Sequence, residues 1–179
     1  YFNLTLNGTG TWDTDSALTV NNNLTIGSGN LLDINGNNLT VTGTLSNDGT
    51  LRLQGGETTV SLIMDTNSGA ISYDGTGTYA GLKLGNTYNN LTIAGSGTWD
   101  LNSALTVNNN LTLSAGVLDL NGQNLAVTGA LSNAATLRLQ GGETAVSIGT
   151  MDIDSGTVAY DGIGTYTGLK AGNSYYDLT

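Results

Sequence analysis

Apolar and polar residues alternate in short segments that recur along the whole chain. Such alternation is typical of a β-strand with one buried face. Between these segments stand clusters of Asn and Gly, residues that accept the positive φ angles of tight turns. No stretch shows the i, i+3, i+4, i+7 apolar spacing of an amphipathic helix. The pattern predicts an all-β chain with strands at 18–20, 24–26, 39–41 and 51–53 and turns at 21–23, 27–29, 35–37 and 55–56.

The sequence contains an internal repeat. The tripeptide Thr11-Trp12-Asp13 returns at residues 98–100, a shift of 87 residues (98 − 11 = 87). The block Leu51–Thr58 returns at residues 137–144, a shift of 86 (137 − 51 = 86). The second copy therefore lacks one residue near Asn30 and gains one near Gly149, both in predicted turns, where length changes are tolerated. We divide the chain into a first unit at 1–87, a second unit at 88–174 and the start of a third unit at 175–179.

The turns divide each unit into about four segments, which in the first unit are 1–22, 23–43, 44–65 and 66–87. Segments of about 20 to 24 residues match one turn of a β-solenoid, whose rungs stack about 4.8 Å apart. We therefore expect a parallel β-helix (β-solenoid) of about eight rungs that forms a rod about 40 Å long. Equivalent residues of the two units would lie about 19 Å apart along its axis. Asn or Thr side chains would form ladders at the corners. The lack of Pro agrees, because nearly every strand must donate hydrogen bonds to a neighbour. A β-sandwich is the alternative, but each unit has a single Trp and few other large aromatic residues for its core.

One rung carries a family resemblance. Residues 45–53 read Leu-Ser-Asn-Asp-Gly-Thr-Leu-Arg-Leu, follow Leu39–Gly43, and return at 131–139 with Ala134-Ala135 in place of Asp48-Gly49. This rung resembles the L-x-N-x-G-x-L-x-L rungs of filamentous-haemagglutinin-like and autotransporter-type surface proteins. The resemblance implies a right-handed parallel β-helix in a large secreted or surface-attached bacterial protein. It carries over no catalytic residues.

The composition narrows the possible functions. The 179 residues include no Cys and no His, so disulfides, thiolate or imidazole metal sites and histidine-based catalysis are excluded. Four Lys and Arg stand against 14 Asp and Glu, and the net charge of −10 disfavours nucleic acid and anionic lipid as partners. No apolar run approaches the roughly 18 residues that cross a bilayer, so we expect no membrane insertion.

Several carboxylates recur in both units, which raises the question of catalysis. Glycoside hydrolysis needs two carboxyl groups about 5 to 10 Å apart across a cleft, and such a site would have to be repeated in every unit. We expect instead that the protein is not an enzyme and has no cofactor. The recurring acids are Asp13 and Asp100, Asp33 and Asp119, Glu57 and Glu143, Asp65 and Asp152, and Asp74 and Asp161.

Calcium binding is another possible role of these carboxylates, because calcium prefers oxygen ligands. Asp13-Thr14-Asp15 and Asp152-Ile153-Asp154 offer paired carboxylates, but neither pair is preserved in the other unit. Turn capping and solubility are the favoured roles, and weak calcium binding stays open.

Aromatic residues are the candidate surface contacts for a ligand such as a glycan, since rings that recur in both units would bind a repetitive ligand with added avidity. A Tyr ladder that packs the side of the solenoid is the structural alternative. Ice is a second candidate ligand because of outward Thr residues such as Thr40 and Thr42, although Ala126 replaces Thr40 in the second unit. Asn-x-Thr sequons such as Asn23-Leu24-Thr25 formally fit N-glycosylation. They are explained equally by an Asn that ends a turn, a Leu that enters the core and a Thr that faces outward. The candidate contacts are Trp12, Tyr73, Tyr79, Trp99, Tyr160 and Tyr166.

These observations lead to a structural expectation. A Tyr-x-x-Leu-Thr pentapeptide starts at Tyr1, Tyr88 and Tyr175, which suggests either a segment of a longer array or a filament subunit. We expect an extracellular or cell-surface location and a rod-like repeat segment of an adhesin or fibre. Its expected partners are further copies of the repeat, in the same chain or end to end, and cell-surface glycans. The alternative is a ligand-binding module, with glycan or ice held by repeated Thr, Tyr and Trp residues.

Overall fold

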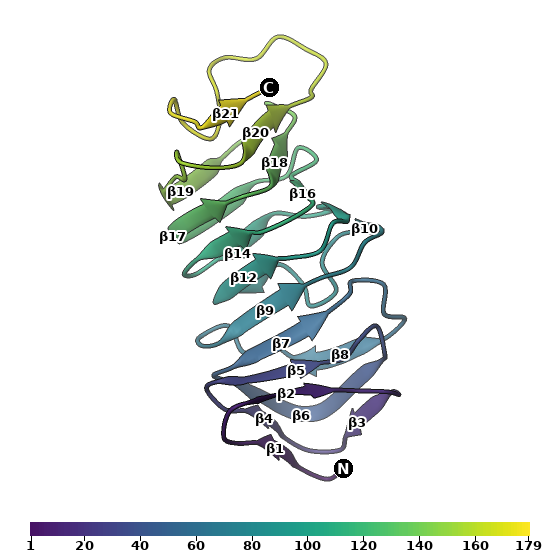
Figure 1. Ribbon diagram of the computed structural model, residues 1–179. Coiled ribbons are helices and arrows are strands. Elements are labelled where there is room, and N and C mark those ends of the chain that lie inside the picture. The colour runs from purple at the N-terminus through teal and green to yellow at the C-terminus, as the bar shows by residue number, and fades with distance from the viewer.

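The computed structural model describes residues 1–179 and shows a single β-solenoid of about nine turns (Figure 1). Every strand pairing in it is parallel, and there is no helix. The chain runs from the N-terminus at one end of the coil to the C-terminus at the other. The predicted parallel β-helix is therefore confirmed, and the β-sandwich, which needs antiparallel hairpins, is excluded.

The strands stack in columns, and each column forms one side of the coil. In the first unit the chain passes through three columns in turn. The first column holds β1 (Leu4–Leu6), β4 (Leu24–Ile26) and the second half of β6 (Leu39–Asn47). The second holds β2 (Gly10–Asp13), β5 (Asn30–Asp33), β7 (Thr50–Leu53) and β9 (Ala70–Tyr73). The third holds β3 (Leu18–Val20), the first half of β6 and β8 (Val60–Ile63).

One of these columns continues into the second unit without a break, whereas the other two sides start new ladders of strands. The column of β9 continues through β12 (Asn90–Ile93), β15 (Leu111–Leu113) and the second half of β17 (Leu125–Asn133). The next side holds β10 (Thr78–Ala80), β13 (Thr98–Asp100), β16 (Val117–Asp119), β18 (Thr136–Leu139), β20 (Thr157–Tyr160) and β21 (Asp177–Leu178). The remaining side holds β11 (Thr87–Tyr88), β14 (Leu105–Val107), the first half of β17 and β19 (Val146–Thr150).

The alternating sequence pattern explains the core. In strands such as β3 and β14 the two Leu or Val side chains point inward, and the Thr between them points outward. Because the register is preserved from rung to rung, Leu24 pairs with Leu45, and Leu111 pairs with Leu131. One cluster of 34 buried apolar residues results, and each fully buried Leu or Val contributes about 1.5–3 kcal/mol.

Asn residues tie the corners together. The Oδ1 atom of Asn3 accepts a hydrogen bond from the Asn23 amide, and the Oδ1 atom of Asn23 accepts one from the Thr44 amide. The second unit repeats the arrangement from Asn90 to Asn110 and from Asn110 to the next rung. The expected Asn ladders are therefore present, and the sequon residue Asn23 serves one of them.

The second unit is turned by one side of the coil relative to the first. Trp12, Leu32, Leu51, Ile71 and Leu91 stack in one column, and over these four turns the residue number advances by 91 − 12 = 79. The repeat is 87 residues long (98 − 11 = 87), which is 8 residues more than four turns (87 − 79 = 8). Eight residues also separate Leu4, on one side of the coil, from Trp12, on the next side (12 − 4 = 8). Leu91, the equivalent of Leu4, therefore stands above Trp12 and not above Leu4.

The same turn occurs at the start of the third unit. In the column of Trp99, Leu178 lies four turns after Trp99, and the residue number again advances by 178 − 99 = 79. Leu178 is the equivalent of Leu91 (178 − 91 = 87). Each unit therefore comprises four turns and one further side, slightly more than the four rungs expected from the sequence.

Candidate functional site at the ends of the solenoid

The recurring carboxylates stabilise turns and pair with arginine. Glu57 is buried, and its two oxygens accept hydrogen bonds from the amides of Gln54 and Gly55 at 2.6 and 2.9 Å. Glu143 makes the equivalent two bonds at 2.7 and 2.8 Å. These side chains are occupied by their own turns, as the capping interpretation predicts.

Arg52 lies among carboxylates on the outer face of its column. Its guanidinium contacts Asp33 at 2.6 Å and Asp74 at 3.3 Å, and the hydrogen bond to Asp33 raises the pKa of Arg52. Arg138 repeats the pairing, with Asp119 at 2.8 Å. No group of three or more acidic side chains is arranged to hold a metal ion.

Asp65 and Asp152 cap equivalent turns in the two units. Burial tends to raise the pKa of Asp65, but hydrogen bonds from the amides of Asn47 and Asn67 outweigh it and leave the pKa below its ordinary value. The Asn133 amide at 2.7 Å is the main cause of the lowered pKa of Asp152. Both carboxylates therefore favour the folded chain in their charged form.

The aromatic residues gather where the two units meet. Trp99 is 0 % exposed, its ring is stacked on that of Tyr79 at a centroid distance of 5.2 Å, and Tyr73 packs against it at 6.4 Å. Tyr79 stands one turn below Trp99 in the same column. This stack is the joint between the first and second units.

A hydrogen-bonded pair of tyrosines supports the joint. The Leu84 amide donates to the hydroxyl of Tyr73, and the Tyr88 hydroxyl donates to the Gly85 carbonyl at 2.7 Å. The hydroxyls of Tyr73 and Tyr88 lie 3.3 Å apart, and since the Tyr88 proton is already used, Tyr73 is the donor between them. Burial raises the pKa of Tyr73 to about 12 and also raises that of Tyr88.

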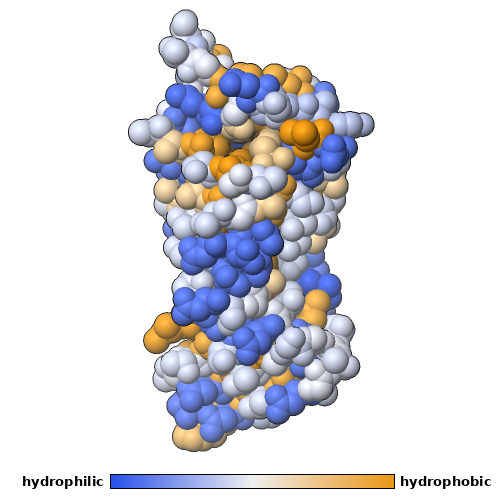
Figure 2. Space-filling view, turned by 90° about the vertical axis from the view of Figure 1, so that its left-hand side faces the viewer, coloured by the Kyte–Doolittle hydropathy of each residue, from blue (hydrophilic) through white to orange (hydrophobic).

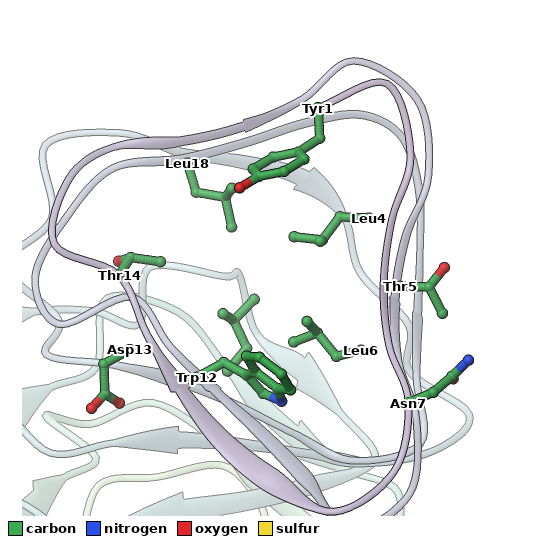
Figure 3. A pocket seen from close by; sticks show the side chains of 10 residues that line it. Tyr1, Leu4, Thr5, Leu6, Asn7, Trp12, Asp13, Thr14 and Leu18 are labelled. Carbon is green, nitrogen blue, oxygen red and sulfur yellow. The ribbon is translucent and has the colours of Figure 1, made fainter.

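The N-terminal end of the coil has no such cover. Trp12, the equivalent of Trp99, is 48 % exposed and lines an open cavity of about 480 Å³. Figure 3 shows Leu4, Leu6, Trp12 and Leu18 pointing into the coil from its three sides, while Asp13 points away. The cavity is the uncovered end of the hydrophobic core.

The indole N–H groups of the two Trp residues differ as well. Trp12 donates its N–H to the Oδ1 atom of Asn30 at 3.2 Å, which fixes the ring against the rung above. The second unit lacks a counterpart of Asn30, and the Trp99 N–H has no hydrogen-bond partner. The ring of Trp12 is therefore held in place without a partner below it.

The C-terminal end exposes the equivalents of residues that are covered at the internal joint. Tyr166, the equivalent of Tyr79, is 41 % exposed, and Leu169 and Leu178 are exposed beside it. Figure 2 shows apolar residues at the surface near this upper end. Tyr160 and Tyr175 repeat the tyrosine pair, with hydroxyls 3.4 Å apart.

The structure thus divides the six aromatic residues selected from the sequence. It brings Tyr73, Tyr79 and Trp99 together at the internal joint, where Tyr73 and Trp99 are fully buried and offer no surface to a ligand. Trp12 is exposed at one end, and Tyr160 and Tyr166 lie at the other. Ligand binding by the accessible rings stays a prediction.

Leucine residues at the ends were not among the sequence-based candidates. Leu178 is 43 % exposed, whereas its equivalent Leu91 is fully buried and pairs with Leu111 of the following rung. The signal that distinguishes Leu178 is its position in β21, the last strand that the structure describes. Leu residues are otherwise indistinguishable from the core residues of this sequence.

The outward hydroxyl groups form short columns. Ser72, Thr92, Thr112 and Ser132 stand in register on one side of the coil. The neighbouring outward positions Ala70, Asn90 and Ala94 carry no hydroxyl. The column is one residue wide, and ice binding stays a prediction.

The parallel coil and its repeated rungs define a β-solenoid repeat protein. No family model, no curated protein and no solved structure matches the chain. The structure holds no helix with the length and apolarity that membrane crossing requires.

Proposed function

We propose that the chain is a structural repeat segment of a secreted or cell-surface fibre or adhesin, in which stacked units form an elongated rod. The observation that supports it is the continuity of the two units. Strand β12 of the second unit pairs with β9 of the first in the same parallel register that joins rungs within a unit. Length therefore grows by duplication, with about 21 Å gained per unit and no new kind of interface.

The side chains support a structural role in the same way. Most of the recurring carboxylates cap turns or pair with arginine. Asp13 has neither kind of partner, and with Asp15 it lines a small surface hollow. The acidic surface, the absence of Cys and the rung at 45–53 fit the resemblance to filamentous-haemagglutinin-like proteins. On this proposal the chain is not an enzyme and carries no cofactor.

Location is the first test of the proposal. Antibodies raised against the purified chain are applied to intact and to permeabilised cells of the source organism, with a ribosomal protein as the internal control. We expect label on intact cells and its loss after brief treatment with an external protease. Label that appears only after permeabilisation contradicts the proposal.

Rod formation is the second test. Small-angle scattering compares the chain with a form in which residues 1–174 are duplicated in tandem. We expect the maximum dimension to grow by about 42 Å while the cross-section stays constant. An unchanged maximum dimension with a wider cross-section contradicts a rod.

One observation favours the ligand-binding alternative, namely the exposed indole of Trp12 over an apolar cavity. Sugar rings stack on such surfaces. A glycan array probed with the wild type and Trp12→Ala tests this function, and binding that survives the substitution excludes the cavity as the site.

A further inference from the structure

The hydrogen-bond ladders between rungs are incomplete at the joint between the two units. Within the second unit consecutive rungs pair on all three sides, as β12 does with β15, β13 with β16 and β14 with β17. At the joint β9 pairs with β12 at four positions, but β8 has no strand above it, and β10 and β11 have none below (Figure 1). No backbone hydrogen bond joins residues 56–67 to residues 78–88. One side of the coil is therefore continuous, and two sides are interrupted.

The interruption is prepared by a capped turn that both units contain. The Asn47 amide donates to the Oδ2 atom of Asp65 at 2.9 Å, and the Ser68 hydroxyl donates to the Asn47 carbonyl at 2.9 Å. These two side chains make hydrogen bonds that a following strand would otherwise make with the end of β6. In the second unit the turn at 152–155 caps Asn133 in the same way, at 2.7 and 2.9 Å. The end of a strand column is therefore a regular feature of the repeat.

The segment above the interruption is bonded to the second unit. Strand β10 pairs with β13, and β11 pairs with β14. Between these strands the Gly81 amide donates to the Asp100 carbonyl at 2.7 Å, and the Thr106 amide donates to the Asn86 carbonyl at 2.8 Å. The segment at 78–88 is therefore fixed to the rung above it and makes no backbone bond with the rung at 56–67 below it.

Side-chain packing fills the interrupted sides. The ring of Tyr79 packs against the turn at Gly55, where an added Cβ would stand 3.3 Å from this ring and 3.0 Å from the Nε1 atom of Trp99. The connection between β10 and β11 contributes Leu82 and Leu84, which are buried. Apolar packing is not directional, so it holds two rungs together without fixing the angle between them as a strand ladder does.

At the surface, one hydrogen bond closes the interrupted sides. The Nδ2 atom of Asn108 donates to the Thr66 carbonyl at 3.1 Å, although the two residues are 42 positions apart in the sequence. One turn of the coil is about 20 residues, so this bond passes over a complete rung. Asn89 and Asn90 also reach across the joint, but they bind the Gly69 carbonyl next to β9, beside the continuous side.

We propose that the joint is a hinge. Its axis is the ladder between β9 and β12, the segment at 78–88 moves with the second unit, and the bond from Asn108 to Thr66 is a latch that keeps the interrupted sides closed. The hydroxyl bonds of Tyr73 start from β9, near the axis, and change least on opening. Opening bends the rod towards the continuous side and uncovers the edge of Trp99 at Gly55. The hinge is a property of the chain itself and does not depend on its place in the cell.

The first experiment compares the two kinds of side by electron paramagnetic resonance between spin labels. The chain has no Cys, so labels are placed by a Ser46→Cys and Ala126→Cys pair on an interrupted side, where β11 restarts the first column, and by a Thr50→Cys and Ala130→Cys pair on the continuous side. The two positions of each pair are 80 residues apart (126 − 46 = 80; 130 − 50 = 80), which is four rungs or about 19 Å.

We expect different distance distributions for the two pairs. The pair on the interrupted side is expected to show a second population that is longer by about 5 Å or more, whereas the pair on the continuous side shows one narrow population. Narrow distributions for both pairs mean a rigid joint and overturn the proposal. Equal broadening of both distributions means general loosening of the coil and overturns it as well.

The second experiment releases the latch. Asn108→Ser in the labelled pair on the interrupted side is expected to raise the ratio of the long to the short population about two- to tenfold, because one exposed hydrogen bond is lost. The matched control is Asn21→Ser, since Asn21 is the equivalent of Asn108 (108 − 21 = 87) but lies away from the joint. An unchanged ratio for Asn108→Ser, or an equal rise for both variants, overturns the latch.

The third experiment places the motion at the joint. Trp12→Phe leaves Trp99 as the single indole, and its quenching by acrylamide reports whether its edge is covered. We expect Asn108→Ser to increase this quenching and Asn21→Ser to leave it unchanged. If the long population rises while Trp99 stays protected, the motion lies elsewhere in the coil and the hinge is overturned. Circular dichroism and thermal unfolding establish that each variant is folded.

Discussion

Trp12 and Trp99 occupy equivalent positions of the repeat but have opposite environments. Trp99 lies in the interior, stacked on Tyr79, whereas Trp12 caps an open cavity with one face in solvent. The local sequence around both is Thr-Trp-Asp. The comparison shows that burial in a solenoid is decided by whether another rung lies above or below a residue.

The largest expected effect follows from this difference. Trp99→Ala removes a fully buried ring from the joint and is expected to lower the free energy of unfolding by about 3–5 kcal/mol. Trp12→Ala removes a half-exposed ring and is expected to cost less than about 2 kcal/mol at concentrations where the protein is monomeric. Urea unfolding followed by circular dichroism measures both. Equal losses contradict the contrast.

Repeat-equivalent residues away from the ends provide the contrast to Trp12 and Trp99, because both members of such a pair have the same environment. Glu57 and Glu143 each accept two backbone hydrogen bonds while buried. Glu57→Ala and Glu143→Ala are therefore each expected to lower the free energy of unfolding by about 2–3 kcal/mol. The two losses should be similar. The same urea series tests this, and a large difference between the two variants indicates that the units unfold independently.

Alkaline pH probes the tyrosine pair at the joint. The pKa of Tyr73 is raised to about 12, so its contribution is complete below the ordinary value near 10 and is lost as the pH rises through 12. The wild type is expected to lose about 2–3 kcal/mol over this range. Tyr73→Phe removes the part of this pH dependence that comes from Tyr73 and leaves the part from Tyr88, so unfolding measured between pH 9 and 12 shows a shallower loss than in the wild type. Identical pH profiles for the two proteins contradict this role of Tyr73.

Acid is expected to have the smallest effect. The pKa of Asp152 is lowered, so its contribution is present above the ordinary carboxylate pKa near 4 and is lost as the pH falls through the lower, folded-state value. Asp152→Asn is expected to be slightly less stable at neutral pH and to lose less stability between pH 4 and 2. Thermal unfolding over this range provides the measurement. If the variant instead loses more stability than the wild type between pH 4 and 2, the lowered pKa of Asp152 does not contribute to acid stability as described.

The sequence predicted the rungs because inward and outward positions alternate strictly. Leu18–Val20 and Leu24–Ile26 are strands as expected, and Asn35 takes a positive φ in the predicted turn. The rotation between the units could not be predicted in the same way. It depends on rung length. The four rungs from Trp12 to Leu91 advance by 79 residues, whereas the four predicted segments span 87, and the difference (87 − 79 = 8) is one side of the coil. The turns do not show where one rung ends within this margin.

The candidate site was only partly predictable. Aromatic rings were the right class of residue, since Trp12 and Tyr166 mark the two ends. Their unequal burial was not evident, because Trp99 carries the same neighbours in sequence as Trp12. The missed signal was the sequence separation of Tyr79 and Trp99 (99 − 79 = 20), which is one turn of the coil.

The extra side in each unit has a consequence for longer assemblies. Since the coil has three sides, three successive units bring a surface feature back to its original azimuth after a rise of about 60 Å. A fibre built this way carries its outer charges and hydroxyls along a screw with that pitch. It resists bending similarly in every direction and presents the same face to neighbours all around it.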